Sequence, residues 1–182
     1  MGNFFSKTLL VFIAVSFAGC KKNEVISDVS KPTTGNTIQY AKGLSIYKYE
    51  GFSVVKVTNP WPKANKDYTY VLQENGTKIP DSLAQNVIIP VPLKTVIVTS
   101  TTHIPSLEML GVETTLAGFP NLDFISSEKV RNLIDQKKVR EIGVGQNLNT
   151  EVIIDIAPDA IVGYGIDNNN PSLDNLQKSG LK

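Results

Sequence analysis

The sequence predicts an α/β fold, namely a three-layer lobe built on a parallel sheet and preceded by a segment rich in β-hairpins. From residue 93 onward, short β-branched runs alternate with amphipathic runs, a pattern that implies parallel strands joined by right-handed helical crossovers. Before residue 93, strand-like runs are separated by turn signals. The predicted organisation is residues 1–19 as a leader, 20–37 as a flexible tether, 38–92 as the β-rich segment and 93–182 as the α/β lobe.

The first twenty residues have the pattern of an export signal. A short polar start with one positive charge precedes an unbroken run of apolar and small residues from Thr8 to Ala18. At helical rise this run covers about half of a ~30 Å hydrocarbon core, so it is too short to span a membrane and fits a secretory signal. The run ends in Phe17-Ala18-Gly19-Cys20, which resembles the lipobox of bacterial lipoproteins and implies cleavage before Cys20 and lipidation of its thiol.

Two other interpretations of this start stay open. Met1-Gly2 with Ser6 also fits the N-myristoylation pattern, and the apolar run could be a buried N-terminal helix with an incidental cysteine. Cys20 is the only cysteine, so disulfides cannot support the fold.

The 18 basic and 17 acidic residues nearly cancel, and no basic stripe is present, so the charge does not favour nucleic-acid binding.

Three strands are predicted in the β-rich segment. Residues 44–49 and 52–57 flank Glu50-Gly51, a short hairpin signal, and residues 68–72 form a third strand candidate. The Pro-flanked loop around Trp61 cannot be regular structure. Pro80, Pro90 and Pro92 make the following stretch irregular or place it at a sheet edge.

Four strands and four helices are predicted after residue 93. The β-branched run 95–99 is typical of a strand buried on both faces. Pro105 suits a first helical turn and Gly111 suits a helix end, while Ser126-Ser127-Glu128 begins a second helix. The final residues have the pattern of a helix leading into a further strand, so we expect this chain to be part of a longer protein. The remaining elements are strands at 114–119, 139–142 and 159–162, and helices at 151–156 and 171–179.

From Pro92 onward the sequence resembles the periplasmic substrate-binding proteins of the iron-siderophore and cobalamin type, in their lipoprotein form. The strongest local match runs from Asn149 to Gly163 and is similar to the family's "NLExIxxLxPDLVI" pattern. Residues 93–102 resemble the family's first strand and ligand loop, residues 106–112 its "LLxLGV" helix end, and residues 116–119 its next strand. The resemblance covers about half of the chain. It implies that residues 93–182 form the N-terminal lobe of a two-lobe binding protein.

The candidate ligand-binding residues follow the predicted parallel strands. Ligands of open α/β sheets bind outside the carboxyl ends of the strands. Hydroxyl, amide and aromatic groups there supply adaptable contacts to a bulky ligand. Trp61, in the Pro-flanked loop, is a further candidate that could stack on an aromatic chelator or pack on the hairpin. The candidates at the strand ends are Thr101, Thr102, His103, Phe119, Gln146, Asn147 and Tyr164.

The resemblance implies a protein that captures an iron-siderophore or a related metal chelate such as cobalamin. It would deliver the chelate to the permease and ATPase subunits of an ABC importer, and Glu151 matches the family glutamate that docks on the permease. The lipid on Cys20 would hold the protein at the periplasmic face of a bacterial membrane. His103, the only histidine, cannot build a His-rich cage, so we expect no metal ligated by the protein itself. It could instead act as a general base or have no chemical role.

We expect no catalytic residues, and no cofactor besides the lipid. Two alternatives stay open, namely a periplasmic α/β-fold enzyme of the hydrolase or flavodoxin-like kind, and a non-catalytic adhesion or assembly lipoprotein. The enzyme would need an acid/base pair or a phosphate-binding loop near the strand ends. The sequence contains no G-x-S-x-G and no C-x-x-C motif.

Overall fold

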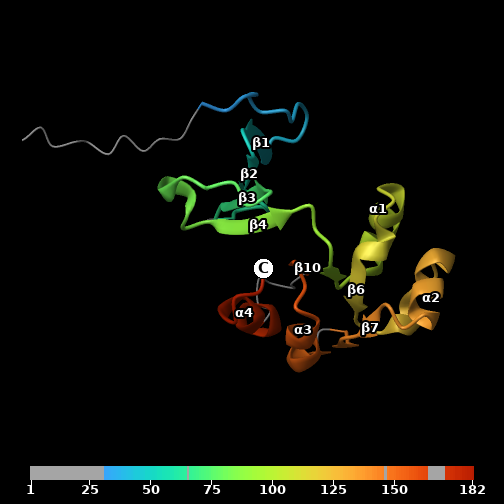
Figure 1. Ribbon diagram of the computed structural model, residues 1–182. Helices are drawn as coiled ribbons and strands as arrows, with labels where there is room; N and C mark the ends of the chain where they lie inside the picture. Colours follow the sequence, from blue (N-terminus) through green and yellow to red (C-terminus); the bar gives the residue numbers. More distant parts are fainter. Residues whose placement is uncertain (1–30, 65, 146, 164–170) are drawn as a thin grey trace, which may run out of the picture.

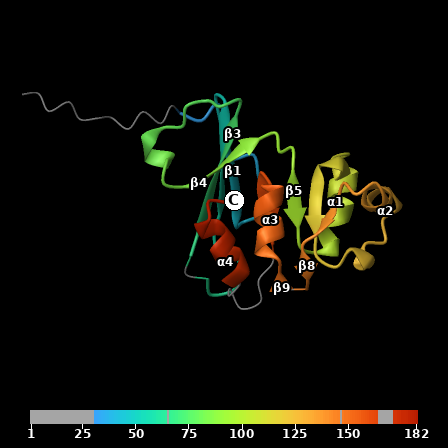
Figure 2. The same ribbon diagram turned by 60° about the horizontal axis from the view of Figure 1, so that its bottom comes forward.

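A computed structural model describes residues 31–64, 66–145, 147–163 and 171–182. The described residues form two separate four-stranded sheets, and Figures 1 and 2 show the first sheet lying beside the strand–helix portion that follows it. Sheet A contains β1 to β4 and sheet B contains β5, β6, β7 and β10. The mixed α/β fold with a parallel sheet, predicted from the sequence, is confirmed.

Sheet A has the strand order β1-β2-β3-β4. The first three strands are antiparallel neighbours, and β4 pairs with β3 in parallel. Gly51 turns the chain between β1 and β2 with a positive φ of 75°, which explains why glycine follows Glu50 in this hairpin. The strands are β1 (Leu44–Tyr49), β2 (Phe52–Val57), β3 (Tyr68–Glu74) and β4 (Val87–Val91).

The sequence does not predict the strand β4, although its prolines are compatible with a sheet edge. Pro90 lies inside β4, opposite Gln73 of β3. Proline has no backbone N–H, and it is tolerated here because β4 has only one neighbouring strand. Of the two interpretations of these prolines, irregular structure or a sheet edge, the sheet edge is therefore correct for Pro90.

Sheet B is parallel, with the strand order β10-β5-β6-β7. The central strand β5 is Val96-Ile97-Val98, and all three residues are buried, as expected of a strand covered on both faces. Two further short strands form a separate antiparallel pair. The strands are β5 (Val96–Val98), β6 (Leu116–Phe119), β7 (Arg140–Glu141), β8 (Gly143–Val144), β9 (Asn147–Leu148) and β10 (Ala160–Val162).

Helices pack on both faces of sheet B. Val96 and Val98 face one core, which includes Val130 and Leu133 of α2. Ile97 points the other way, into a core that it shares with residues of α3 and α4. Alternate side chains of β5 therefore pack into the cores on the two faces of sheet B, because successive residues of a strand point to opposite sides. The helices are α1 (Ile104–Met109), α2 (Glu128–Asp135), α3 (Thr150–Ile156) and α4 (Pro171–Lys178).

Residues 33–37, which the sequence placed in a flexible tether, are hydrogen-bonded along the outer edge of β1. The Thr33 N–H donates to the carbonyl of Lys48 at 2.7 Å, and the Thr37 N–H donates to the carbonyl of Ile46 at 3.2 Å. The Ile46 N–H in turn donates to the Asn36 side-chain oxygen at 3.0 Å. This part of the chain is thus attached to sheet A.

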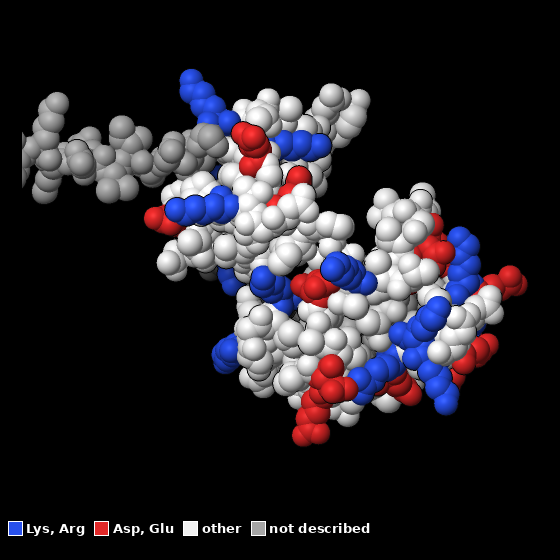
Figure 3. All heavy atoms as spheres, viewed as in Figure 1, with Lys and Arg blue, Asp and Glu red and all other residues white. Residues whose placement is uncertain are grey.

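The described helices are all too short or too polar to cross a membrane. On the face seen in Figure 3, acidic and basic side chains are interspersed and no patch of a single sign stands out, in keeping with the balanced composition.

Candidate functional site

The parallel order of sheet B places the carboxyl ends of β10, β5, β6 and β7 at one edge, which we call the carboxyl edge. Hydrogen bonds join the segments that leave these strands. The Thr99 N–H donates to the carbonyl of Val162 at 3.1 Å, and the Asn121 N–H donates to the carbonyl of Gly143 at 3.0 Å. The loops that contain the predicted ligand-binding residues therefore emerge next to one another.

The loop after β5 presents hydroxyl groups to solvent. Thr101 and Thr102 are exposed in a 3-10 turn, Thr101–His103, which leads directly into α1. Ser100 caps this turn by accepting a hydrogen bond from the Thr102 N–H at 3.3 Å, and its hydroxyl lies 2.8 Å from that of Thr102. His103 is half-buried, and its Nδ1 is buried without a hydrogen-bond partner in the part of the chain that the structure describes.

The loop after β6 differs from the sequence-based expectation. Phe119 is only 2% exposed and packs in the core beside α2, so its side chain is not presented at the carboxyl edge. Phe124, a few residues further on in the 3-10 turn Leu122–Phe124, is instead 66% exposed. Aromatic content alone does not distinguish these two phenylalanines, because the difference depends on which one lies in the buried strand.

The loop after β7 forms the hairpin of β8 and β9. Asn147 is exposed in β9, and Val144 is 60% exposed in β8, directly opposite it. Gly143 has a φ of 122°, and a Cβ atom at this position would collide with the carbonyl oxygen of Asn147. The hairpin therefore requires glycine, and it brings Val144, which is not among the candidates predicted from the sequence, to the carboxyl edge.

Three predicted functional residues lie outside the described part of the chain, namely Cys20, Gln146 and Tyr164.

Glu151 is exposed in the first turn of α3, where Asn149 caps the helix by accepting the Val152 N–H at 3.2 Å. Among the described residues, no group of three or more His, Cys, Asp or Glu side chains could hold a metal ion.

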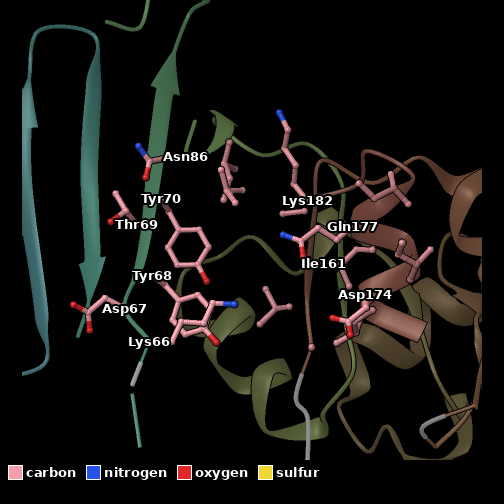
Figure 4. Close-up of a pocket in the computed structure, with 18 of the residues that line it drawn as sticks. Lys66, Asp67, Tyr68, Thr69, Tyr70, Asn86, Ile161, Asp174, Gln177 and Lys182 are labelled. Atoms are coloured by element: carbon pink, nitrogen blue, oxygen red, sulfur yellow. The ribbon is translucent and has the colours of Figure 1, made fainter. Parts of the chain in front are cut away.

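A groove lies between sheet A and the segment formed by β10, α4 and the residues after α4. This groove has a volume of about 710 Å³. Figure 4 shows Tyr68 and Tyr70 of β3 facing Ile161 of β10 and Gln177 of α4 across it. We call it the tyrosine groove. Sequence analysis did not find it, because its walls come from residues about ninety positions apart.

Trp61 lies at the border of the tyrosine groove and does not line it. Its ring centroid is 6.3 Å from that of Tyr68, at an interplanar angle of 57°. The Tyr68 and Tyr70 rings are nearly parallel, with an angle of 9° and centroids 6.4 Å apart. Burial raises the pKa of Tyr70, and the neighbouring Tyr68 raises it further, so the Tyr70 phenol keeps its proton at neutral pH.

No protein-family model, curated protein or solved structure matches this chain.

Proposed function

We propose that this protein is the substrate-binding lipoprotein of an ABC import system, and that it captures a metal chelate of the iron-siderophore or cobalamin type. In this proposal sheet B and its helices form the N-terminal lobe of a two-lobe binding protein, and the ligand lies against the carboxyl edge. The observation that supports it most is the parallel order β10-β5-β6-β7, which gathers the candidate loops at one edge. Parallel α/β sheets bind ligands at that location.

The side chains at the carboxyl edge suit an amphipathic ligand. Thr101, Thr102 and Asn147 offer hydroxyl and amide groups, while Phe124 and Val144 offer exposed apolar surface. A chelate has a polar centre and an organic periphery, and it brings its own metal ligands. A binding protein for such a complex needs contacts of both kinds, and it needs no coordinating cluster of its own.

The charge near the edge favours a chelate of low net charge. The two arginines of the chain are both engaged in other contacts, because Arg131 donates to the carbonyl of Leu122 in the turn after β6 and Arg140 pairs with Asp155. The charged residues next to the edge loops, Asp123 and Glu141, are acidic and exposed. The described residues of the edge loops themselves include no lysine or arginine that would be free to offset the desolvation of a strongly anionic complex. Neutral complexes are therefore the preferred members of this ligand class.

Delivery requires an anchor and a docking group. In the proposal, the lipid on Cys20 holds the protein at the periplasmic face of the membrane, and Glu151 contacts the permease. The exposed position of Glu151 at the start of α3 leaves its carboxylate free to meet a positively charged partner surface. The protein binds and releases its ligand without catalysing a reaction.

The test is equilibrium binding of the full chain to ferrichrome, ferric enterobactin and cyanocobalamin, measured by ultrafiltration. We expect micromolar or tighter binding of at least one complex, with the neutral complexes preferred. The double variant Thr102→Ala/Asn147→Ala should bind at least tenfold more weakly. Thr114→Ala is the matched control, since Thr114 is an exposed threonine that precedes the amino end of β6. Failure of the folded protein to bind any of the three complexes would overturn the proposal.

A further inference from the structure

Sheet A is apolar on both of its faces. On one face Val54 and Val71 are paired in register and buried, together with Phe52. Paired residues of neighbouring strands project on the same side, and the next pair along projects on the other. The opposite face therefore carries Val55 paired with Tyr70, and none of its residues is fully buried. This half-exposed face is the first wall of the tyrosine groove.

The second wall comes from β10 and α4. Ile161 and Leu173 lie at the margin of the core under sheet B and also line the groove. Aliphatic side chains of Val87 and Ile89 face them from sheet A. The volume of about 710 Å³ lies within the range of ~300–1,000 Å³ that is usual for small-molecule sites. Two facing apolar walls suit an organic molecule better than a solvated ion.

Among the described residues, the charged side chains that line the groove cancel. Lys66 and Asp67 come from the sheet A wall, and Asp174 and Lys182 come from the other wall, which gives two positive and two negative groups. The amide of Gln177 adds both donors and an acceptor near the aliphatic surface. A ligand with a net charge would lose hydration without a net opposite charge to compensate it. A neutral ligand with a hydrogen-bonding group has no such cost.

Tyr68 and Tyr70 favour a ligand that contains a ring. Their rings are nearly parallel, and the Lys66 ammonium lies 5.0 Å from the Tyr68 ring centroid. Aromatic rings favour offset-stacked or edge-to-face contact with another ring. We propose that the tyrosine groove binds an uncharged, ring-containing organic molecule that carries a hydroxyl or amide group. This site goes beyond the proposed import function, because its walls include sheet A and its ligand requires no metal.

The probes are three naphthalene compounds that differ in charge, namely 2-naphthol, 2-naphthoate and 2-naphthylmethylammonium, titrated calorimetrically into the full chain at pH 7. We expect 2-naphthol to bind, and both charged compounds to bind at least tenfold more weakly. No binding of 2-naphthol up to millimolar concentration would overturn the proposal. Binding of either charged compound as tight as that of 2-naphthol would overturn it as well.

A matched pair of variants tests the location. Gln177 and Lys178 are adjacent exposed residues of α4, but only Gln177 lines the groove. Gln177→Trp should fill the groove and weaken 2-naphthol binding at least tenfold, whereas Lys178→Trp should leave it unchanged. Tyr70→Leu, which keeps apolar volume but removes the ring, should also weaken binding, with folding checked by thermal unfolding. Equal affinity in the two tryptophan variants would overturn the assignment to this groove.

Discussion

Thr95 and Asp159 exchange hydrogen bonds immediately before the neighbouring parallel strands β5 and β10. The Thr95 N–H donates to Oδ2 of Asp159 at 2.9 Å, and the Asp159 N–H donates to the carbonyl of Thr95 at 3.0 Å. The same carboxylate oxygen accepts the Lys94 N–H at 2.7 Å. The exchange joins residues 64 positions apart and aligns the two strands whose carboxyl ends contribute to the candidate site.

Asp159→Asn should destabilise the fold. The amide that replaces the carboxylate is a weaker acceptor for two converging N–H groups, and a hydrogen bond to a charged group contributes about 1.5–3 kcal/mol. We expect the free energy of unfolding to fall by about 1–3 kcal/mol in urea titrations. Asp135→Asn is the control, because Asp135 is exposed at the end of α2. Equal midpoints for the two variants would contradict the role of Asp159.

The same residue should make stability depend on pH. The N–H groups of Thr95 and then Lys94 hold the pKa of Asp159 below its ordinary value of 3.8. Because the folded-state pKa lies below the unfolded one, the stabilisation is present above the unfolded value and is lost as the pH falls through the folded value. Between pH 6 and pH 3, wild type should lose more unfolding free energy than Asp159→Asn does. Parallel pH curves would mean that Asp159 contributes nothing to this dependence.

Gly143→Ala should disrupt the hairpin of β8 and β9. The added Cβ would collide with the carbonyl oxygen of Asn147 and would approach the Asn149 nitrogen to 3.0 Å, and the φ of 122° is itself unfavourable for alanine. Gly145→Ala is the comparison, because Gly145 also has a positive φ but open space around it, so its cost should be about 1–2 kcal/mol. Thermal unfolding should rank Gly143→Ala as clearly the less stable, and the reverse order would disprove the steric argument.

Glu151→Ala tests docking on the permease, which rests on the proposed import function. Because Glu151 is exposed in the first turn of α3 and is not one of the candidate ligand-binding residues, chelate affinity should be almost unchanged while uptake into cells falls at least severalfold. Glu128→Ala is the matched control, since Glu128 is an exposed glutamate in the first turn of α2 and experiences the same helix-dipole effect. Uptake that falls equally in both variants, or in neither, would remove the docking role.

Local signals predicted the elements that depend on neighbours in sequence. The hairpin of β1 and β2 follows from Glu50-Gly51, and β5 follows from its β-branched run. The start of α2 follows from Ser127, whose side chain accepts a backbone N–H group. These features are set by turn geometry and capping, which the residues themselves specify.

Features that depend on tertiary arrangement were not predictable. The strands β3 and β4 pair in parallel although the chain between them forms only a 3-10 turn, Asp81–Leu83, and no α-helical crossover. The pairing of β8 with β9 depends on the positive φ of Gly143. The burial of Phe119 and the exposure of Phe124 follow from where β6 ends. The tyrosine groove required two segments distant in sequence to face each other, and no local pattern carries that information.

The segment 33–37 on β1 and Pro90 in β4 together protect sheet A from self-association. A free edge strand offers unpaired backbone groups to another chain, and a partly uncovered apolar sheet is especially prone to aggregate in this way. Here the β1 edge is already hydrogen-bonded by residues 33–37, while Pro90 removes a donor from the β4 edge. Sheet A can therefore keep one apolar face available for a ligand without offering a template on which further copies would stack into fibrils.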